Sequence, residues 1–423
     1  MSAQTSLEHS SSDAEPSLKK AYEFKWPVKR VAVIGAGVAG LTAYRELKED
    51  GFDVHVFERD NLPGGNWHYT DEISAEAPVP NAPIAVADFE PSLPPQGVDL
   101  PHSEEYDDEA LCALHRRDHR KPKPIWHGLD FDGVVVATGC YTTPNMPPIP
   151  GLAEWAKAFP GSVLHSSRYR RQQMVAGRKV LMVGAGSSGS QISREIAPHA
   201  DKIYQSVRVQ DPSQRPTIID WVRTIPQNVS IVAEIKSFHS PGSTIQETAI
   251  ELVDGTILTG IDYVLFSTGF LQTYPFLPEY INPSLGRTGE APEDAPIKPI
   301  ITDGTHVRSL HLDTFYIDNP TLTFVNANLG ISSFTYGYFQ AFAISMVWSG
   351  KAQLPKREEM WRLYRERVKE IGYGKQFSII GGRRSQKMVR YFRGWLNAAA
   401  AKSGGRQING LPIVYVALPH PGN

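Results

Sequence analysis

The stretch KRVAVIGAGVAGLTAYRELKEDGFDVHVFE, Lys29 to Glu58, decides the fold. A β-branched run (VAVI) leads into GxGxxG, then into a segment with apolar residues at helical spacing, and then into a second short run (DVHVF). Strand, glycine turn, helix and strand in this order are typical of a dinucleotide-binding unit. We expect Leu41, Tyr44 and Leu47 to form the stripe that docks this helix on its sheet.

The three glycines of the turn have different physical tasks. Gly35 permits the tight turn, Gly37 lets the backbone approach a pyrophosphate, and Gly40 lets the helix pack closely on its strand. The N–H groups of the first helical residues, Val38 and Ala39, then face the phosphates together with the positive end of the helix dipole.

The same pattern returns about 150 residues later as KVLMVGAGSSGSQISREIAPHADKIYQSVR, Lys179 to Arg208. A single GxGxxG is weak evidence, because glycine turns are common in unrelated loops. Two copies in the same strand–turn–helix context predict two nucleotide-binding units, and Ile192 and Ile196 supply the apolar stripe of the second helix. The second phosphate loop comprises Gly184, Gly186, Ser187, Ser188 and Gly189.

The residue that ends the second strand of each unit discriminates between cofactors. Glu58 ends it in the first unit, and a carboxylate there binds an adenosine ribose and repels a 2′-phosphate, which fits FAD or NAD. Val207 holds the position in the second unit, between Ser206 and Arg208. A guanidinium with a neighbouring hydroxyl favours the 2′-phosphate of NADPH. The alternative is that Arg208 is an ordinary solvated residue at a strand end.

The loop after Glu58 reads RDNLPGGNWHY. Gly64 and Gly65 suit a close backbone approach, and Asn66 and Trp67 follow them. We place Gly65, Asn66 and Trp67 beside the flavin; the alternative is a plain turn with a core tryptophan.

The composition of the chain argues against several classes of partner and site. The chain has 423 residues, 41% hydrophobic and 21% charged, with a formal net charge of −2, so nucleic acid is not expected as a partner. Cys112 and Cys140 lack the spacing of a metal site or a redox pair. Residues 1–26 are polar and are expected to be disordered, and no membrane span or secretory signal is expected, which favours a cytoplasmic location.

Three further segments connect the two units. FDGVVVATG (131–139) and DYVLFSTGF (262–270) are each a buried-strand run that ends in Thr-Gly, and FPGSVLHSSRY (159–169) lies between the two glycine motifs. The last segment carries Phe159, Gly161, His165 and Tyr169 in the spacing FxGxxxHxxxY.

With these motifs the chain, from about residue 28 to 355, resembles the flavin-containing monooxygenases, a branch of the class B flavoprotein monooxygenases. The resemblance implies that NADPH reduces FAD and that a flavin hydroperoxide passes one oxygen of O2 to a small molecule. Because Baeyer–Villiger enzymes resemble this family but end the fingerprint in tryptophan, Tyr169 points to nitrogen or sulfur as the acceptor. His165 would then belong to a hinge between domains, and no catalytic side chain is assigned.

The sequence departs from the family pattern between Trp67 and Phe131. The region 68–130 is short and proline-rich, and the L-x-T-N-x-P segment of the family is not visible in it. Either part of the loop that stabilises the oxygenating flavin is lost, or the sequence comes from an imperfect gene model.

We therefore predict an α/β protein with two Rossmann-like dinucleotide-binding domains, the NADPH domain inserted into the FAD domain. FAD-binding parts are expected at 27–165 and 301–423, the NADPH domain at 166–300, and hinges near 159–170 and 270–300. The predicted function is N- or S-oxygenation, with a role in secondary metabolism. Two rivals remain: a degenerate flavoprotein NADPH oxidase or regulatory nucleotide-binding protein, and a Baeyer–Villiger-type oxygenase. A disulfide reductase would share the two folds but needs a redox cysteine pair, which Cys112 and Cys140 do not provide.

Overall fold

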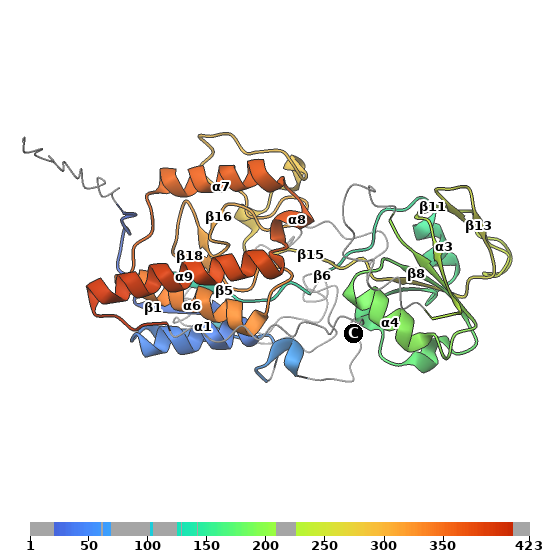
Figure 1. Ribbon diagram of the computed structural model, residues 1–423, viewed down its shortest axis with the longest axis horizontal. Helices are drawn as coiled ribbons and strands as arrows, with labels where there is room; N and C mark the ends of the chain where they lie inside the picture. Colours follow the sequence, from blue (N-terminus) through green and yellow to red (C-terminus); the bar gives the residue numbers. More distant parts are fainter. Residues whose placement is uncertain are drawn as a thin grey trace, which may run out of the picture.

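The computed structural model describes residues 21–60, 62–68, 129–141, 143–208 and 226–408, and the backbone of 102–104 and 125–127. Figure 1 shows two α/β bodies side by side, one built on each glycine motif. The predicted disordered tail lies outside the described residues up to position 20. Residues 21–26, however, contact the first body: the Tyr22 N–H donates to Leu354 O (3.0 Å) and the Trp26 indole to Asp132 O (3.1 Å).

The first body contains a six-stranded sheet in the order β16-β17-β18-β5-β1-β2. Four neighbouring strands are parallel, so their carboxyl ends meet at one edge; Ile34, Val136 and Phe324 lie in register there. The bounds are β1 Arg30–Ile34, β2 Asp53–Phe57, β5 Gly133–Val136, β16 Leu310–His311, β17 Phe315–Tyr316 and β18 Leu322–Phe324.

Both faces of this sheet are covered, with alternate residues of each strand facing opposite cores. Val31, Val33 and Val135 pack with the helices α1 (Val38–Glu49), α6 (Ser333–Trp348), α7 (Arg357–Ile371) and α9 (Gly381–Ser403). On the other face, Val136 and Phe324 pack against the segment 274–307. The short helix α8 (Lys375–Ser378) precedes α9.

Helix α6 is buried on nearly all sides from Tyr336 to Trp348. The apolar run FQAFAISMVW, Phe339 to Trp348, forms the carboxyl part of this buried helix. Among the described residues, no helix has both the length and the apolar character needed to cross a bilayer.

Helix α1 does not dock on the sheet through the predicted stripe of Leu41, Tyr44 and Leu47. Leu47 is buried, but Leu41 and Tyr44 are 43% and 40% exposed. The buried face consists instead of Ala39, Gly40, Ala43, Glu46 and Leu47. The expectation was wrong because the close approach allowed by Gly40 brings the small-residue face of the helix against the sheet, which turns the large side chains outward. In α4 (Ser187–Ile196), Ile192 and Ile196 are both buried, as expected.

The second body contains a parallel five-stranded sheet in the order β10-β9-β8-β14-β7. Helix α4 covers one face, while α3 (Leu152–Ala158) and an antiparallel sheet of β11, β12 and β13 cover the other. The bounds are β7 Val163–His165, β8 Lys179–Val183, β9 Lys202–Ser206, β10 Val229–Val232, β11 Ile235–Phe238, β12 Ile250–Leu252, β13 Ile257–Leu258 and β14 Tyr263–Phe266.

The chain passes between the bodies through β6 (Thr143–Pro144) and β15 (Phe270–Leu271), which pair antiparallel. Met146, Leu152 and Trp155 already belong to the core of the second body, and Tyr274 and Ile300 belong to the first. The crossing points therefore lie nearer 143 and 271 than the domain boundaries expected at 165/166 and 300/301. A further pair, β3 (His102–Glu104) and β4 (Ile125–His127), is antiparallel.

Two buried histidines of the first body make its stability sensitive to acid. Burial lowers the pKa of His306 and His311 to about 4. Between pH 6.5 and 4 these histidines bind protons in the unfolded chain but stay neutral in the folded chain. The free energy of unfolding therefore falls as the pH is lowered through this window, by roughly 2–3 kcal/mol per histidine. We expect the denaturant midpoint to fall between pH 6.5 and 4.5 and His306→Gln to reduce the slope. An unchanged slope in this variant would contradict the assignment.

Candidate functional site: glycine loops at the carboxyl edges of two sheets

The first glycine loop is shaped by the packing of its own backbone. Gly35 follows β1 with φ +104°, and its N–H donates to Phe57 O (2.7 Å). A Cβ on Gly40 would stand 1.8 Å from Gly35 O, so only glycine lets α1 approach the turn this closely. Gly37 is different: its φ is −72°, and an added Cβ would meet Gly65 Cα at an ordinary 3.8 Å. Packing thus requires Gly40, while Gly37 leaves free space at the start of α1.

The N-terminus of α1 is available to an anion. No side chain of the described residues caps this helix, so the amides of its first turn, beginning with Val38 and Ala39, are open to an external acceptor.

Glu58 is held firmly beside this loop. One carboxylate oxygen accepts from the Ala36 N–H (2.5 Å) and the other from the Asp60 N–H (2.9 Å). Each oxygen keeps a second lone pair for a ribose hydroxyl. An open hollow of about 270 Å³ adjoins it, lined by Ala36, Leu41, Tyr44, Val56, Glu58, Asp60, Leu62 and Pro63.

The Gly-Gly-Asn-Trp turn lies directly on the glycine loop. The Gly64 N–H donates to Ala36 O (2.8 Å), and a Cβ on Gly65 would stand 3.1 Å from Gly37 Cα. Gly65, Asn66 and Trp67 form one 3-10 turn. Trp67 is 71% exposed and contacts the ring of Phe334 edge to face at 5.1 Å. The alternative of a core tryptophan is therefore excluded, and the tryptophan face remains accessible.

Sequence reasoning missed a fourth contributor to this edge. Asn326 and Asn328 follow β18 and are buried, and their side-chain oxygens have no hydrogen-bond partner among the described residues. The available signal was the run TLTFV ending in NANLG, because polar residues just after a parallel strand collect at its carboxyl edge.

The second glycine loop repeats the geometry of the first. Gly184 has φ +95°, and a Cβ on Gly189 would stand 2.2 Å from Gly184 O. Gly186 has open space, since an added Cβ would meet nothing within 4 Å among the described residues. Ser187 and Ser188 open α4, which no described side chain caps. Both loops thus place a glycine with free space at an uncapped helix start, which is the arrangement that anion-binding loops share.

The two residues expected to bind a 2′-phosphate differ in the structure. Arg208 is 83% exposed and is 3.5 Å from Glu234, so its guanidinium is free to reorient. Ser206 is buried, and its hydroxyl donates to Ala233 O (2.9 Å). The Ser206 hydroxyl proton is therefore already engaged, and of the two side chains only that of Arg208 extends into solvent.

The fingerprint residues lie in and around β7, where they contact the second body and the crossing strand β15. Phe159 packs on Trp155 at 5.3 Å, and Gly161 turns the chain with φ +80°. His165 is buried; its Nε2 lies 3.0 Å from Gly269 O and its ring 5.0 Å from Phe270, where β15 begins. His165 thus joins the second sheet to a crossing strand, which is the position that a hinge residue would occupy.

Tyr169 packs against the core beneath α4. Burial, and then the nearby Glu195, raise the pKa of its phenol, so it stays neutral. The contacts described for Phe159, His165 and Tyr169 are packing contacts and hydrogen bonds within the second body and to the crossing strand β15.

The described cysteine is not a redox thiol. Cys140 is buried, and burial raises its pKa to about 11, so it is a thiol at neutral pH. Cys112 lies outside the described residues.

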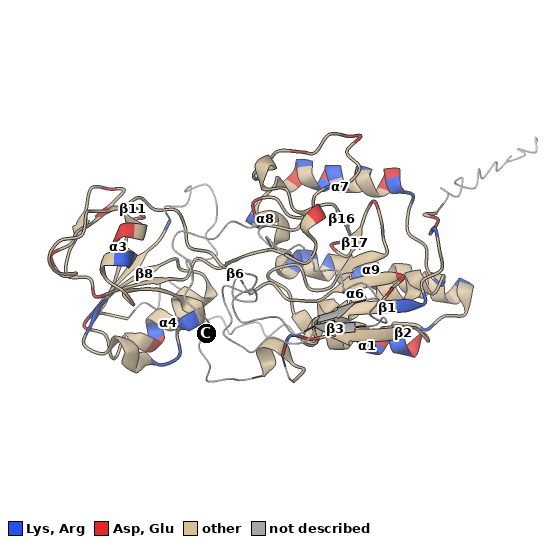
Figure 2. Ribbon diagram, turned by 180° about the vertical axis from the view of Figure 1, so that it is seen from behind, with Lys and Arg blue, Asp and Glu red and all other residues tan. Residues whose placement is uncertain are grey.

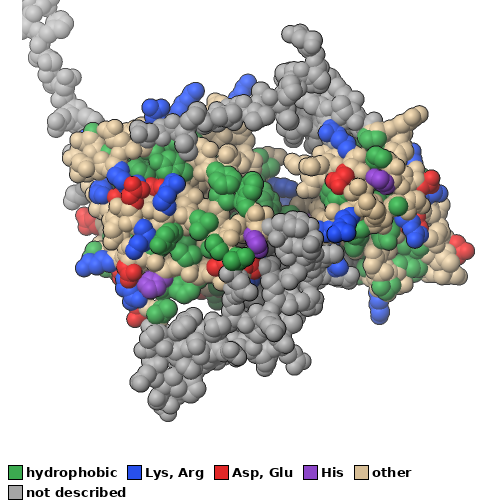
Figure 3. All heavy atoms as spheres, turned by 90° about the horizontal axis from the view of Figure 1, so that it is seen from below, with side chains coloured by type: hydrophobic (Ala, Val, Ile, Leu, Met, Phe, Trp, Pro, Cys, Tyr) green, Lys and Arg blue, Asp and Glu red, His purple; other side chains and the backbone are tan. Residues whose placement is uncertain are grey.

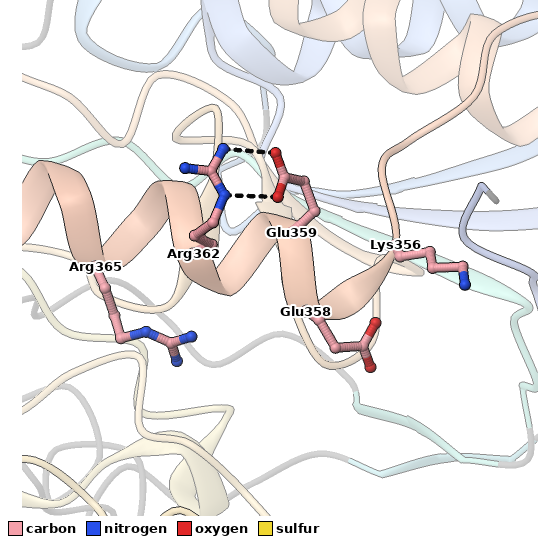
Figure 4. A pocket seen from close by; sticks show the side chains of 5 residues that line it. All are labelled: Lys356, Glu358, Glu359, Arg362 and Arg365. Atoms are coloured by element: carbon pink, nitrogen blue, oxygen red, sulfur yellow. Dashed lines mark hydrogen bonds and ion pairs between the residues drawn. The ribbon is translucent and has the colours of Figure 1, made fainter. Parts of the chain in front are cut away.

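A larger hollow, about 380 Å³, lies on α7 and is lined by Lys356, Glu358, Glu359, Arg362 and Arg365 (Figure 4). Arg362 binds Glu359 through two hydrogen bonds of 2.7 Å. The residues that line it are charged residues of α7 and Lys356 just before it, with no aromatic or aliphatic residue among them, so we assign no site to it.

Comparison with known proteins agrees with this geometry. A family model described as pyridine nucleotide-disulphide oxidoreductase matches residues 29–273, which include both glycine loops. The chain is 38% identical to the flavin-containing monooxygenase iboF of Amanita muscaria, with 92% of each chain covered. It is 28% identical to the flavin-containing monooxygenase ustF2 of Aspergillus flavus, over 88% of this chain and 92% of the relative.

Solved structures share the fold. The S-allyl-L-cysteine S-oxygenase from Allium sativum has a TM-score of 0.58 and 23% identity, with 90% of each chain covered. Tmm from Pelagibacter sp. strain HTCC7211 has a TM-score of 0.55 and 18% identity, with 89% of this chain and 86% of that chain covered. At these identities the likeness concerns the architecture of two joined α/β bodies.

Proposed function

Because the chain belongs to the flavin-containing monooxygenase family, we propose that it binds FAD and NADPH and transfers one oxygen atom of O2 to a nitrogen or sulfur atom of a small molecule. The observation that carries the proposal is the pair of glycine cradles, each at the carboxyl edge of a parallel sheet and at an uncapped helix start. The crossing strands β6 and β15 join the two bodies, whose separation on one face is seen in Figure 3.

In the first body the residues fit FAD. The free space at Gly37 and the amides of Val38 and Ala39 would hold the pyrophosphate, and Glu58 would hold the ribose. Gly65, Asn66 and exposed Trp67 would flank the flavin end, together with Asn328. When bound, the flavin supplies the redox and oxygen chemistry; the chain positions the partners and limits the access of water.

In the second body the residues fit the nicotinamide dinucleotide. Gly186, Ser187 and Ser188 would cradle its pyrophosphate, and Arg208 would bind the 2′-phosphate with a guanidinium fork. The buried carboxamide of Gln205 donates to Gly184 O (2.7 Å) and so holds the second glycine loop in place.

If Arg208 binds the 2′-phosphate, its removal should weaken the binding of NADPH but not that of NADH. We expect Arg208→Ala to raise the KM for NADPH at least ~10-fold and to leave the KM for NADH unchanged, because only NADPH carries the 2′-phosphate. Steady-state oxidation with both nucleotides measures this. Arg178→Ala is the matched control, since Arg178 immediately precedes β8, at the amino edge of the second sheet, where it lies 3.5 Å from Asp262. An equal rise of the KM for NADPH and for NADH in Arg208→Ala would contradict the assignment of Arg208 to the 2′-phosphate.

The choice of nitrogen or sulfur as acceptor, and a role in secondary metabolism, are part of the same proposal. Tyr169 at the end of the fingerprint supports the first. The similarity to monooxygenases of the fungi Amanita muscaria and Aspergillus flavus is in keeping with the second.

One observation favours a rival function, an NADPH oxidase that releases hydrogen peroxide. The alignment with the Amanita protein extends over 494 positions, more than the 423 residues of this chain, so that relative carries residues that this chain lacks. The two functions separate when peroxide formed per NADPH consumed is measured with amine and thioether substrates. A ratio well below one with an oxygenated product supports the monooxygenase; a ratio near one with every substrate supports the oxidase.

A further inference from the structure

Lys375 opens α8, on the side of the first body that faces the second (Figure 1). The helix is anchored in the first body, because Phe377 is buried in its core and Ser378 O accepts from the Leu329 N–H (2.9 Å). The ammonium of Lys375, however, reaches the turn that follows β14 of the second body. Its Nζ stands 3.1 Å from the position that a Cβ on Gly269 would take. A cation of the first body thus lies on the second.

The turn that Lys375 reaches packs against the second glycine loop. This turn, 267–269, follows β14, which pairs with β8, and the glycine loop follows β8. Ser267 O stands 2.8 Å from the position of a Cβ on Gly184, and Ser267 Cβ stands 3.1 Å from that of a Cβ on Gly189. Lys375 therefore lies beside the loop that we assign to the pyrophosphate of the nicotinamide dinucleotide.

Hydrogen bonds hold this turn in place. Gly269 O accepts from the Asn145 N–H (2.9 Å) and lies 3.0 Å from His165 Nε2. The hydroxyl of Thr268 donates to Asn145 O. The ammonium of Lys375 thus rests on a fixed part of the second body, and its place relative to the glycine loop is set by the packing of both bodies.

The strand order places two cations on opposite sides of the glycine loop. In the order β9-β8-β14, Arg208 comes after β9, the glycine loop after β8, and the turn below Lys375 after β14. The three strands are parallel, so all three features lie at one carboxyl edge. Because dinucleotides bind across this edge, a pyrophosphate at the loop would have Lys375 on the side of the first body.

The charge of Lys375 is not balanced by a carboxylate in the part of the chain that the structure describes, where it forms no ion pair. Partial desolvation lowers the pKa of its ammonium, and the positive charge of Arg208 lowers it further. An anion bound between the two cations would relieve this repulsion. Lysine is a common point-charge ligand for phosphate, and a pyrophosphate supplies the missing negative charge.

We propose that Lys375 of the first body binds the pyrophosphate of the dinucleotide held by the second body, so that the bound nucleotide joins the two bodies. The inference rests on the proposed function, which assigns NADPH to the second glycine loop. It adds a phosphate ligand that belongs to neither glycine motif and comes from the other body.

Calorimetric titration of the FAD-loaded protein with two probes tests the proposal. NADP⁺ carries the pyrophosphate and the 2′-phosphate, whereas adenosine 2′-monophosphate carries only the 2′-phosphate. We expect Lys375→Met to weaken the binding of NADP⁺ at least ~5-fold and to leave that of adenosine 2′-monophosphate unchanged. Arg208→Ala should weaken the binding of both. Unchanged NADP⁺ affinity in Lys375→Met, or equal weakening of both probes, would overturn the proposal.

Two further variants separate this contact from a general effect of charge. Lys369→Met removes another exposed lysine of the first body, in the last turn of α7, and should bind NADP⁺ like the native protein. Lys375→Arg keeps the charge and should lose less NADP⁺ affinity than Lys375→Met. The Tm of Lys375→Met without nucleotide should equal that of the native protein, because no ion pair to the described residues is lost. Equal weakening by Lys369→Met would contradict the site.

Chemical labelling gives a second readout that needs no variant. Saturating NADP⁺ should slow the acetylation of Lys375 by N-hydroxysuccinimidyl acetate, measured by mass spectrometry, and should leave the acetylation of Lys369 unchanged. Acetylation of Lys375 at the same rate with and without NADP⁺ would contradict the contact. If the native protein does not bind NADP⁺ at all, the proposed function fails. If it binds NADP⁺ and Lys375→Met binds it equally well, only the role of Lys375 fails.

Discussion

Replacing Gly40 with alanine is expected to remove the flavin and to lower the Tm of the whole protein. The new Cβ would stand 1.8 Å from Gly35 O and 2.9 Å from Gly35 C, both backbone atoms of the turn. Helix α1 would have to move away from β1, and overpacking on this scale costs about 3 kcal/mol or more. The ratio of flavin to protein absorbance after purification and a thermal melt measure the two effects.

Gly37→Ala is the matched variant in the same loop. Its φ of −72° suits any residue, and the added Cβ would make only an ordinary contact at 3.8 Å. We expect a Tm close to that of the native protein without cofactor, but at least ~10-fold weaker FAD binding, because a methyl group would occupy the proposed pyrophosphate position. If Gly37→Ala binds FAD like the native protein, the cradle is assigned wrongly. If Gly40→Ala keeps both flavin and Tm, the packing argument fails.

Arg406→Ala is expected to be strongly destabilising, because one guanidinium joins two buried carboxylates at the carboxyl end of α1. Arg406 binds Glu46 (2.9 Å) and Asp50 (2.9 Å), both with side chains 2% exposed. Removing one partner of a buried ion pair leaves uncompensated charge and costs roughly 3–5 kcal/mol. Arg45→Ala is the control: Arg45 also binds Glu46 (2.7 Å) but is 62% exposed, so its loss should cost less than ~1 kcal/mol. Equal losses of unfolding free energy in urea would refute the distinction.

The same cluster has a defined response to acid. Burial raises the pKa of Asp50, but hydrogen bonds from Arg406, Lys351 and Ser345 outweigh burial and lower the pKa to about 2. Its contribution is therefore present above pH 4 and is lost as the pH falls towards 2. Arg406→Ala should weaken this part of the acid transition without abolishing it, because Lys351 and Ser345 still bind Asp50, while the earlier loss between pH 6.5 and 4 that comes from the histidines should remain.

Much of the framework was predictable because it depends on local rules. The β-branched runs became β1 and β8, the short runs after the helices became β2 and β9, and both GxGxxG turns lie at a strand end and a helix start. Glycine spacing and strand patterning act over a few residues, and the second copy of the pattern confirmed the first. The buried character of α6 also follows from its composition alone.

The failures share one cause, which is that they depend on contacts distant in sequence. Leu41 and Tyr44 have helical spacing, but the face of α1 that packs was decided by the approach at Gly40. Ser206 stands two residues before Arg208 in sequence, yet its hydroxyl donates to Ala233 O on another segment. The crossing at 143 rather than 165 depends on Met146 and Trp155 finding the core of the second body.

The sequence by itself determined the two nucleotide-binding units and the family fingerprint, because glycine, strand and helix signals are local and recur at fixed spacing. Only the tertiary structure decided which groups share a site. It brought Trp67 to Phe334 and His165 to Gly269, from segments up to 267 residues apart. Such neighbours arise from the order of strands in a sheet and the direction of the helices on it, which no short stretch of sequence records.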